Sequence, residues 1–237
     1  MSDTNDQGVV VFGYNFVHKK TQDFLFRMFA EGIPIRSVIA ADPVKLNIPA
    51  SSIRSKIRHT GVMHPRDVAS AIGADYVVMP HRGEEIVEYL GGLRPEIGVI
   101  AGARILRAPV IDSFSKGVVN FHPGLIPEAR GLDALYWGIV DQVPLAVTSH
   151  LIDSRVDAGD LLEVRKLPLF RDDTLFDLSE RLYETQLDML GEAIEKTRAR
   201  DTISIDYSSS TCNRKMPPEM EATVEGRLAE YLEKFGS

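Results

Sequence analysis

Two residues near the middle of the chain, Asn120 and His122, have types and a spacing suited to acyl-group chemistry. The apolar pair Val118-Val119 predicts a buried strand, and alternation along a strand would place Asn120 and His122 on one face at its end. Pro123 favours an extended backbone at His122, and Gly124 permits a sharp turn after it. An amide donor and an imidazole would then lie together at the carboxyl edge of a sheet, where ligands of open α/β folds bind. A single histidine at a strand end is more often structural, so this pair does not define a site by itself.

The residues around this pair resemble the active-site signature of the formyltransferases that use 10-formyltetrahydrofolate. That signature is Asn-x-His-Pro-Ser-Leu-Leu-Pro, then a short loop, a glycine and a helix; residues 120–131 follow it, with Gly124 in place of the serine and Ile126 in place of the second leucine. Residues 101–106 are similar to the family's folate-pocket strand end, and residues 147–159 to its catalytic-aspartate loop. The resemblance covers roughly residues 95–200, whereas the first 90 residues match only as a generic nucleotide-binding-like half.

Formyl transfer to an amine passes through a tetrahedral intermediate with a negatively charged oxygen. It needs a donor to that oxygen, a group that takes the amine's proton, and a partner that holds this group. Asn120 suits the first role, and His122 could serve as a second donor or as the proton-transfer group, with an acidic residue fixing the ring. The downstream loop offers Asp153, Asp157 and Asp160, and any one of them could serve only as a turn residue. The resemblance implies Asp157, so the implied catalytic residues are Asn120, His122 and Asp157.

The resemblance also implies a folate pocket, because the formyl donor of the family is 10-formyltetrahydrofolate. A flat heteroaromatic ring needs an apolar slot with backbone hydrogen bonds, which Ile105 and Leu106 would supply at a strand end. The residues implied for donor binding are Arg104, Ile105, Leu106, Asp153 and Val156. We expect no metal, since the six histidines lack paired ligand spacing and the single Cys212 cannot build a cysteine site.

The elements that must position these residues alternate between strands and helices. This alternation predicts an α/β fold with a doubly wound, mostly parallel, Rossmann-like sheet. Apolar runs predict strands at 9–12, 35–41, 76–79, 97–100, 118–119, 146–151, 160–167 and 203–205. Amphipathic patterns predict helices from Thr21, at 64–71, 84–90 and 132–140, from the cap Thr174 to about 198, and at 222–235. We expect a long loop over residues 44–62, a catalytic domain over 1–200 and a C-terminal extension over 201–237.

Composition limits the partners and the compartment. A formal net charge of −7 without a basic stripe argues against a nucleic-acid partner. The chain has no run of apolar residues long enough to span a membrane, and its start is polar and acidic. A single cysteine suits the reducing cytoplasm. We therefore expect a cytoplasmic protein that acts on a small-molecule amine, with no membrane partner and with a homodimer left open.

The acceptor is inferred by elimination among the substrates of the family, and a nucleotide-linked amino sugar fits best. Residues 13–15 read Gly-Tyr-Asn, not the Gly-Ser-Asn turn with which glycinamide ribonucleotide formyltransferases hold a phosphate, and the acidic charge disfavours initiator tRNA. Asn15, Lys19 and Arg82, near strand ends, are candidate acceptor contacts. Three alternatives remain: glycinamide ribonucleotide as acceptor, hydrolysis of formyltetrahydrofolate, and a noncatalytic nucleotide-binding module, which the intact Asn-His-Asp set disfavours.

Overall fold

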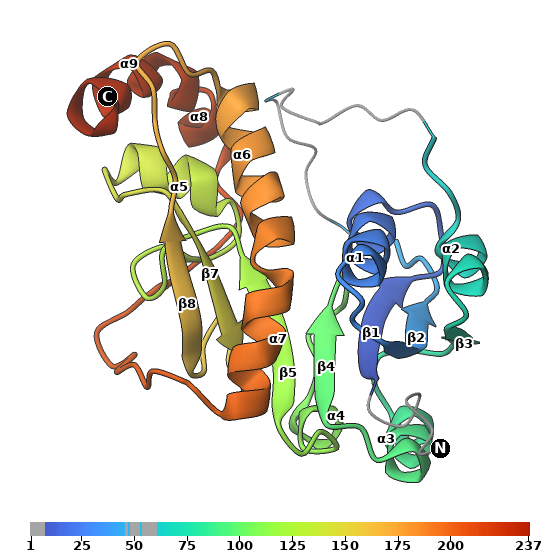
Figure 1. Cartoon of the computed structure of the whole chain (residues 1–237). Helices are drawn as coiled ribbons and strands as arrows, with labels where there is room; N and C mark the ends of the chain where they lie inside the picture. Colours follow the sequence, from blue (N-terminus) through green and yellow to red (C-terminus); the bar gives the residue numbers. More distant parts are fainter. Residues whose placement is uncertain (1–7, 46, 48–52, 54–60) are drawn as a thin grey trace.

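The computed structural model describes residues 8–45, 47, 53 and 61–237, so most of the predicted loop over residues 44–62 lies outside the described residues. In the described chain, seven strands form one sheet in the order β3-β2-β1-β4-β5-β7-β8 (Figure 1). They are β1 Val9–Tyr14, β2 Ile35–Ala41, β3 Asp75–Val78, β4 Ile97–Ile100, β5 Gly117–His122, β7 Ala146–Leu151 and β8 Leu161–Lys166. Strands β1 to β5 pair in parallel, whereas β7 is antiparallel to β5 and β8 is antiparallel to β7. The predicted α/β fold with a mostly parallel sheet is confirmed.

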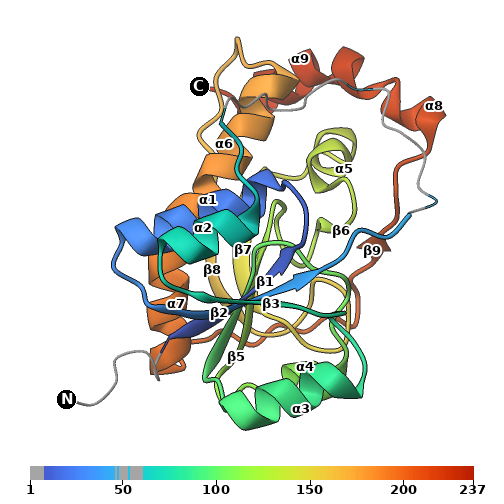
Figure 2. The ribbon, with the colours of Figure 1, turned by 90° about the vertical axis from the view of Figure 1, so that its right-hand side faces the viewer.

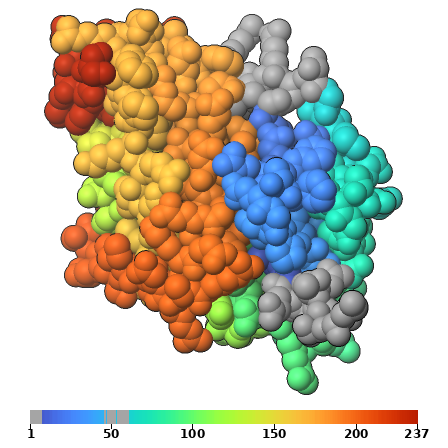
Figure 3. Space-filling model, in the orientation of Figure 1, coloured from blue at the N-terminus to red at the C-terminus, as the bar shows by residue number. Residues whose placement is uncertain are grey.

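Helices cover both faces of the sheet (Figure 2). One face carries α1 Lys19–Ala30, α2 Pro65–Ala71, α6 Leu175–Asp188 and α7 Leu190–Ala199, and the other carries α3 Glu84–Leu93 and α4 Ala108–Ile111. Because alternate residues of a strand point to opposite faces, Val9 and Val11 of β1 enter one apolar core and Val10 and Phe12 enter the other. On the first face, α1 lies directly beside the α6–α7 column at the molecular surface (Figure 3).

The predicted helix from Thr174 to about residue 198 is present with one interruption. Thr174 forms a capping box, in which its Oγ1 accepts from Asp177 N at 3.3 Å while its own N donates to Asp177 Oδ2 at 2.8 Å. The helix is divided at Met189, where α6 ends and α7 begins. The first helix begins at Lys19 instead of Thr21, because the His18 side chain accepts from Thr21 N and caps it.

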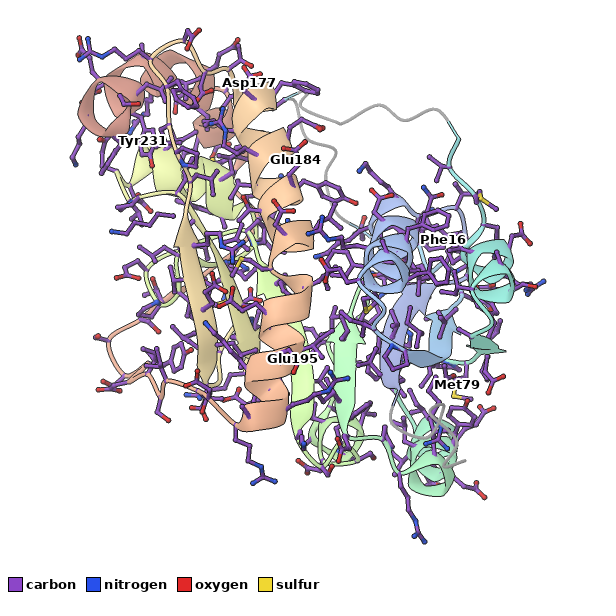
Figure 4. The ribbon with its side chains drawn as sticks, in the orientation of Figure 1. Phe16, Met79, Asp177, Glu184, Glu195 and Tyr231 are labelled. Atoms are coloured by element: carbon purple, nitrogen blue, oxygen red, sulfur yellow. The ribbon has the colours of Figure 1, made fainter. Side chains whose placement is uncertain are left out.

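The C-terminal extension packs against β6 and α5, which follow the Asn120–His122 strand in the sequence. Its strand β9, Cys212–Asn213, pairs in parallel with β6, Arg130–Gly131, and is followed by α8 Pro218–Glu221 and α9 Val224–Phe235. Helix α9 lies against α5, Ala134–Val140, and its buried Tyr231 (Figure 4) donates from its hydroxyl to Val143 O at 2.8 Å. The predicted strand 203–205 is wrong, because only Ile203 forms an isolated bridge, to Leu161. The division at residue 200 stays a prediction.

Candidate active site

The end of β5 places Asn120 and His122 on one face of the sheet. Both residues pair with β7, where Asn120 lies opposite His150 and His122 lies opposite Thr148. The residue between them, Phe121, is buried in the core on the other face. Regular strand register therefore brings the two side chains together, as the alternation of a strand requires.

Asp157 joins this pair. Its Oδ1 accepts a hydrogen bond from Asn120 Nδ2 at 3.4 Å, and its Oδ2 lies 3.4 Å from His122 Nδ1. Oδ2 also accepts from the backbone N–H of Gly131 at 3.0 Å. The structure thus brings together the three residues that the resemblance implied as catalytic, while their roles in a reaction stay a prediction.

The loop that carries Asp157 has an unusual backbone conformation. Asp157 itself has a φ of +42°, in the left-handed region that residues with a side chain seldom adopt. Gly159 has a φ of +113°, and a Cβ there would lie 2.0 Å from Leu151 O. Ala158, between them, is fully buried. Only glycine fits at position 159, which gives a structural reason for the Asp-Ala-Gly order in the sequence.

Both ring nitrogens of His122 are engaged. Nε2 lies 2.8 Å from the carbonyl oxygen of Ala129, and because a carbonyl can only accept, Nε2 donates a proton there. Nδ1 then faces Asp157 Oδ2, and that contact is attractive only when a proton lies between nitrogen and carboxylate. The Ala129 carbonyl and the Asp157 carboxylate therefore hold the imidazole from its two nitrogens.

His150 is a residue of the site that the sequence did not indicate. Its ring is fully buried, and its Nε2 accepts a hydrogen bond from Asn120 Nδ2 at 3.2 Å. Burial lowers the pKa of His150 to about 4, against the opposing effect of the Asp157 charge, so the ring is neutral at pH 7 and can accept. His150 thereby orients the Asn120 amide. The sequence could have indicated His150 only if residues 146–151 had been known to pair with β5. No local pattern specifies that antiparallel pairing.

A cavity of about 450 Å³ opens in front of these groups, within the size range of small-molecule sites. Asn120, His122 and Asp157 line it together with residues 131–136, which run from the end of β6 into the first turn of α5. Among the residues described, no group of three or more His, Cys, Asp or Glu side chains is arranged to hold a metal ion. No helix in the same residues is long and apolar enough to cross a membrane.

The predicted folate segment and the start of the Asp157 loop contribute to the same apolar cluster. Leu106 is buried in that cluster, and Ile152 packs against it. Ile105 is 71% exposed and Val156 is 41% exposed. Of the three apolar residues predicted for donor binding, Ile105 and Val156 therefore expose side-chain surface, whereas the Leu106 side chain is occupied in the core.

The two polar residues predicted for donor binding have protein contacts of their own. The Arg104 guanidinium lies 5.6 Å from the centre of the Tyr14 ring, at the end of β1. Asp153 forms an ion pair with Arg155, whose Nε donates to Asp153 Oδ2 at 3.0 Å. Arg104 therefore extends toward the first strand, whereas Asp153 is held within its own loop.

Two of the residues predicted to contact an acceptor are bonded within the protein. Asn15 donates from Nδ2 to Asp42 Oδ1 at 2.7 Å and accepts from the Tyr76 hydroxyl at 2.8 Å. Lys19 forms an ion pair with Asp23 one turn along α1. Each side chain is thus oriented by contacts within the protein, while Asn15 Nδ2 and Lys19 Nζ each carry at least one further N–H.

Comparison with known proteins identifies the class to which this fold and site belong. The family model for formyl transferases matches residues 39–194, most of the chain, and the protein belongs to the formyl transferase family. A methionyl-tRNA formyltransferase from Finegoldia magna is 25% identical over 197 residues, covering 82% of this chain and 57% of the relative. One from Pelobacter propionicus is 31% identical over 150 residues, covering 61% of this chain and 47% of the relative. The chain thus spans about half the length of the curated relatives that it matches.

Solved structures share the fold at low sequence identity. A sugar N-formyltransferase from Shewanella sp FDAARGOS_354 superposes with a TM-score of 0.62 at 17% identity, over 92% of this chain and 88% of that chain. Glycinamide ribonucleotide transformylase 1 from Symbiobacterium toebii has a TM-score of 0.62 at 20% identity, over 84% and 92%. The formyltransferase PseJ from Anoxybacillus kamchatkensis, in complex with UDP-4,6-dideoxy-4-formamido-L-AltNAc and tetrahydrofolate, has a TM-score of 0.55 at 17% identity, over 88% and 86%.

Proposed function

We propose that the protein transfers the formyl group of 10-formyltetrahydrofolate to the amino group of a small substrate. One observation carries this proposal: Asp157 contacts both Asn120 and His122 at the wall of a cavity, inside the segment that matches the family. The donor supplies an activated formyl carbon. The exposed Ile105 and Val156 suit its flat ring system, and the proposed donor-binding residues are Arg104, Ile105, Leu106, Asp153 and Val156.

In the proposed reaction, the acceptor amine attacks the formyl carbon, a new N–C bond forms, and the C–N bond to the donor breaks. Asn120 donates from its amide to the oxygen that gains negative charge. To do so, its Nδ2 must give up one of its two hydrogen bonds, either the one to Asp157 or the one to His150. The His122–Asp157 pair takes the proton that the amine loses and returns one to the departing nitrogen. Protons and charge therefore balance without a further reactant.

We further propose that the acceptor is a nucleotide-linked amino sugar. The net charge of −7 suits a small acceptor better than tRNA. The end of β1 supports the same choice, since the rings of Tyr14 and Phe16 are stacked there with centres 5.0 Å apart. Phe16 is labelled in Figure 4. Aromatic rings at this place suit a ligand that carries a planar base.

A side-by-side assay tests donor and acceptor together. Conversion of 10-formyltetrahydrofolate to tetrahydrofolate is followed by absorbance with amino-sugar nucleotides, glycinamide ribonucleotide, methionyl-tRNA or buffer alone. We expect turnover with an amino-sugar nucleotide only. Turnover with glycinamide ribonucleotide alone would show that this compound, and not an amino-sugar nucleotide, is the acceptor. Equal turnover in buffer alone would show that the protein hydrolyses the donor.

A further inference from the structure

Tyr207, in the C-terminal extension, lies against the loop that carries Asp157. Its side chain is 8% exposed, and its hydroxyl donates to the carbonyl oxygen of Gly159 at 2.6 Å. Its ring belongs to a small buried apolar cluster that also contains Ala158, the residue directly after Asp157. One side chain, 48 residues later in the sequence than Gly159, therefore supports the loop on the carboxyl side of Asp157.

The ring of Tyr207 also supports the residues before Asp157, through two arginines. The guanidinium groups of Arg130 and Arg155 each lie 4.9 Å from the centre of the ring, a distance at which a cation is attracted to an aromatic face. Arg130 donates to Val156 O at 2.7 Å, and Arg155 is part of the loop itself. Tyr207 thus holds the loop on both sides of Asp157.

The residues that these arginines hold are among those proposed to bind the formyl donor. The backbone N–H of Arg155 donates to Asp153 Oδ1 at 2.7 Å, and its Nε donates to Asp153 Oδ2 at 3.0 Å. Val156, whose carbonyl oxygen accepts from Arg130, has a partly exposed side chain. The ring of Tyr207 is therefore connected to the donor-binding part of the loop, whereas its hydroxyl supports the part that follows Asp157.

The position of Tyr207 is itself fixed within the extension. Its carbonyl oxygen accepts from the backbone N–H of Ser210 at 3.1 Å and from the Ser210 hydroxyl at 3.0 Å, which closes a turn. Ser210 Oγ in turn accepts from Arg130 at 2.7 Å. Burial raises the pKa of Tyr207 against the opposing charges of Arg130 and Arg155, so the hydroxyl keeps its proton and donates at neutral pH.

We propose that Tyr207 is a positioning residue of the site: its hydroxyl keeps Asp157 against Asn120 and His122, and its ring keeps the donor-binding residues in place. The inference rests on the proposed role of these residues in formyl transfer. Loss of the hydroxyl alone should act on kcat, because a displaced proton-transfer group slows the reaction without removing a contact to the donor. Loss of the ring also releases Arg130 and Arg155, and should act on the KM for the donor as well.

The first test separates kcat from the KM for 10-formyltetrahydrofolate. Tyr207→Phe keeps the ring and is expected to lower kcat by roughly 3- to 10-fold with an unchanged KM, since one hydrogen bond is lost. Tyr207→Leu is expected to lower kcat as far and to raise the KM by about 5-fold, since the contacts of the ring with two cations are lost.

Tyr231→Phe is the matched control for the first test. It removes another buried hydroxyl of the extension, which donates to Val143 O, and is expected to lower the melting temperature while kcat and KM stay the same. Tyr207→Phe that behaves like this control overturns the inference. An equal rise of KM in Tyr207→Phe and Tyr207→Leu overturns the separate role of the ring.

The second test needs no substrate and follows amide hydrogen exchange by NMR in Tyr207→Phe. The N–H of Gly131 donates to Asp157 Oδ2 at 3.0 Å, so its exchange reports whether the carboxylate stays in place. The N–H of Leu132 donates to Asn213 O at 3.0 Å and reports whether β6 and β9 (Figure 2) remain paired. We expect exchange at Gly131 to become roughly 3- to 10-fold faster and exchange at Leu132 to be unchanged.

The two tests distinguish failure of this inference from failure of the proposed function. If the wild type formylates no acceptor, the proposed function fails, while the exchange at Gly131 still decides whether Tyr207 holds Asp157. If formylation proceeds and neither kcat nor the exchange at Gly131 responds to Tyr207→Phe, only this inference fails.

Discussion

Asn120 and His122 reach the site by a different route from Asp157. The first two are supplied by β5, a central strand paired with β4 on one side and β7 on the other. Asp157 is supplied by a loop with two left-handed residues and is held by a donor from Gly131, far away in the sequence. The site therefore combines a part fixed by regular strand pairing with a part fixed by individual long-range contacts.

The second part depends on the C-terminal extension. The buried Arg130 donates from one guanidinium nitrogen to Val156 O and from another to Ser210 Oγ, each at 2.7 Å. Its guanidinium also lies 4.9 Å from the centre of the Tyr207 ring. Arg130 thus connects the Asp157 loop to the extension, and we expect damage to the extension to disturb Asp157 before Asn120 or His122.

The largest effects are expected when the side chains of Asn120, His122 or Asp157 themselves are replaced. Asn120→Ala, His122→Ala and Asp157→Asn should each lower turnover by roughly 10²-fold or more, because each removes an oxyanion donor or a member of the proton-transfer pair. A double variant should cost far less than the product of the singles. Formyl-transfer assays and circular-dichroism melts on the same preparations measure this. A folded variant with full activity would exclude that residue from the mechanism.

Gly159→Ala should damage only the loop part. The new Cβ would meet Leu151 O in a left-handed conformation, so we expect a free energy of unfolding lower by about 1–3 kcal/mol and kcat lower by about 10-fold. Gly226→Ala in α9 is the control, because a Cβ there meets no described atom within 4 Å and alanine favours a helix. Urea unfolding and kcat are compared for the pair. Equal behaviour of the two variants would contradict the importance of the loop conformation.

Acid should weaken the strand part through His150. Its folded-state pKa of about 4 lies below the ordinary value of 6.5, so the unfolded chain binds the proton first as pH falls. The stability contributed by the neutral ring is complete above pH 6.5 and is lost as pH falls toward 4, on the order of 3 kcal/mol. Urea unfolding at a series of pH values should show a shallower dependence for His150→Gln. Parallel curves would contradict this, since His18 titrates in the same window in both proteins.

The smallest effect is expected far from both parts. Thr174→Ala removes the capping box of α6 and should cost about 1 kcal/mol of unfolding free energy with kcat unchanged. Thermal melts and turnover measured together test this. A large fall in kcat would show that α6 positions the site more directly than its contacts indicate.

The parts of the molecule that the sequence predicted are those governed by local patterns. The strand before Asn120, its alternation and the Thr174 cap all depend on neighbouring residues, and they are present. The antiparallel placement of β7, which brings His150 to Asn120, depends on pairing between distant segments that no periodicity encodes. The alternation at 203–205 predicted a strand, yet strand formation needs a partner along its length, and Leu161 pairs only with Ile203. Leu106 follows the pattern of a pocket residue and is buried, because its neighbours in space come from other strands and helices.

The pairing of β6 with β9 also has a consequence for the newly synthesised chain. Arg130 emerges from the ribosome well before Ser210, its partner 80 residues later. At synthesis rates of roughly 5–20 residues per second, this interval lasts about 4–16 s, time enough for the parallel strands to associate. Until Cys212 and Asn213 have been added, β6 lacks its partner strand β9. Gly131, which donates its N–H to Asp157, is then not yet held by that pairing. A nascent chain can thus hold a nearly complete seven-stranded sheet before residues 210–213, which support the Asp157 loop, have been synthesised.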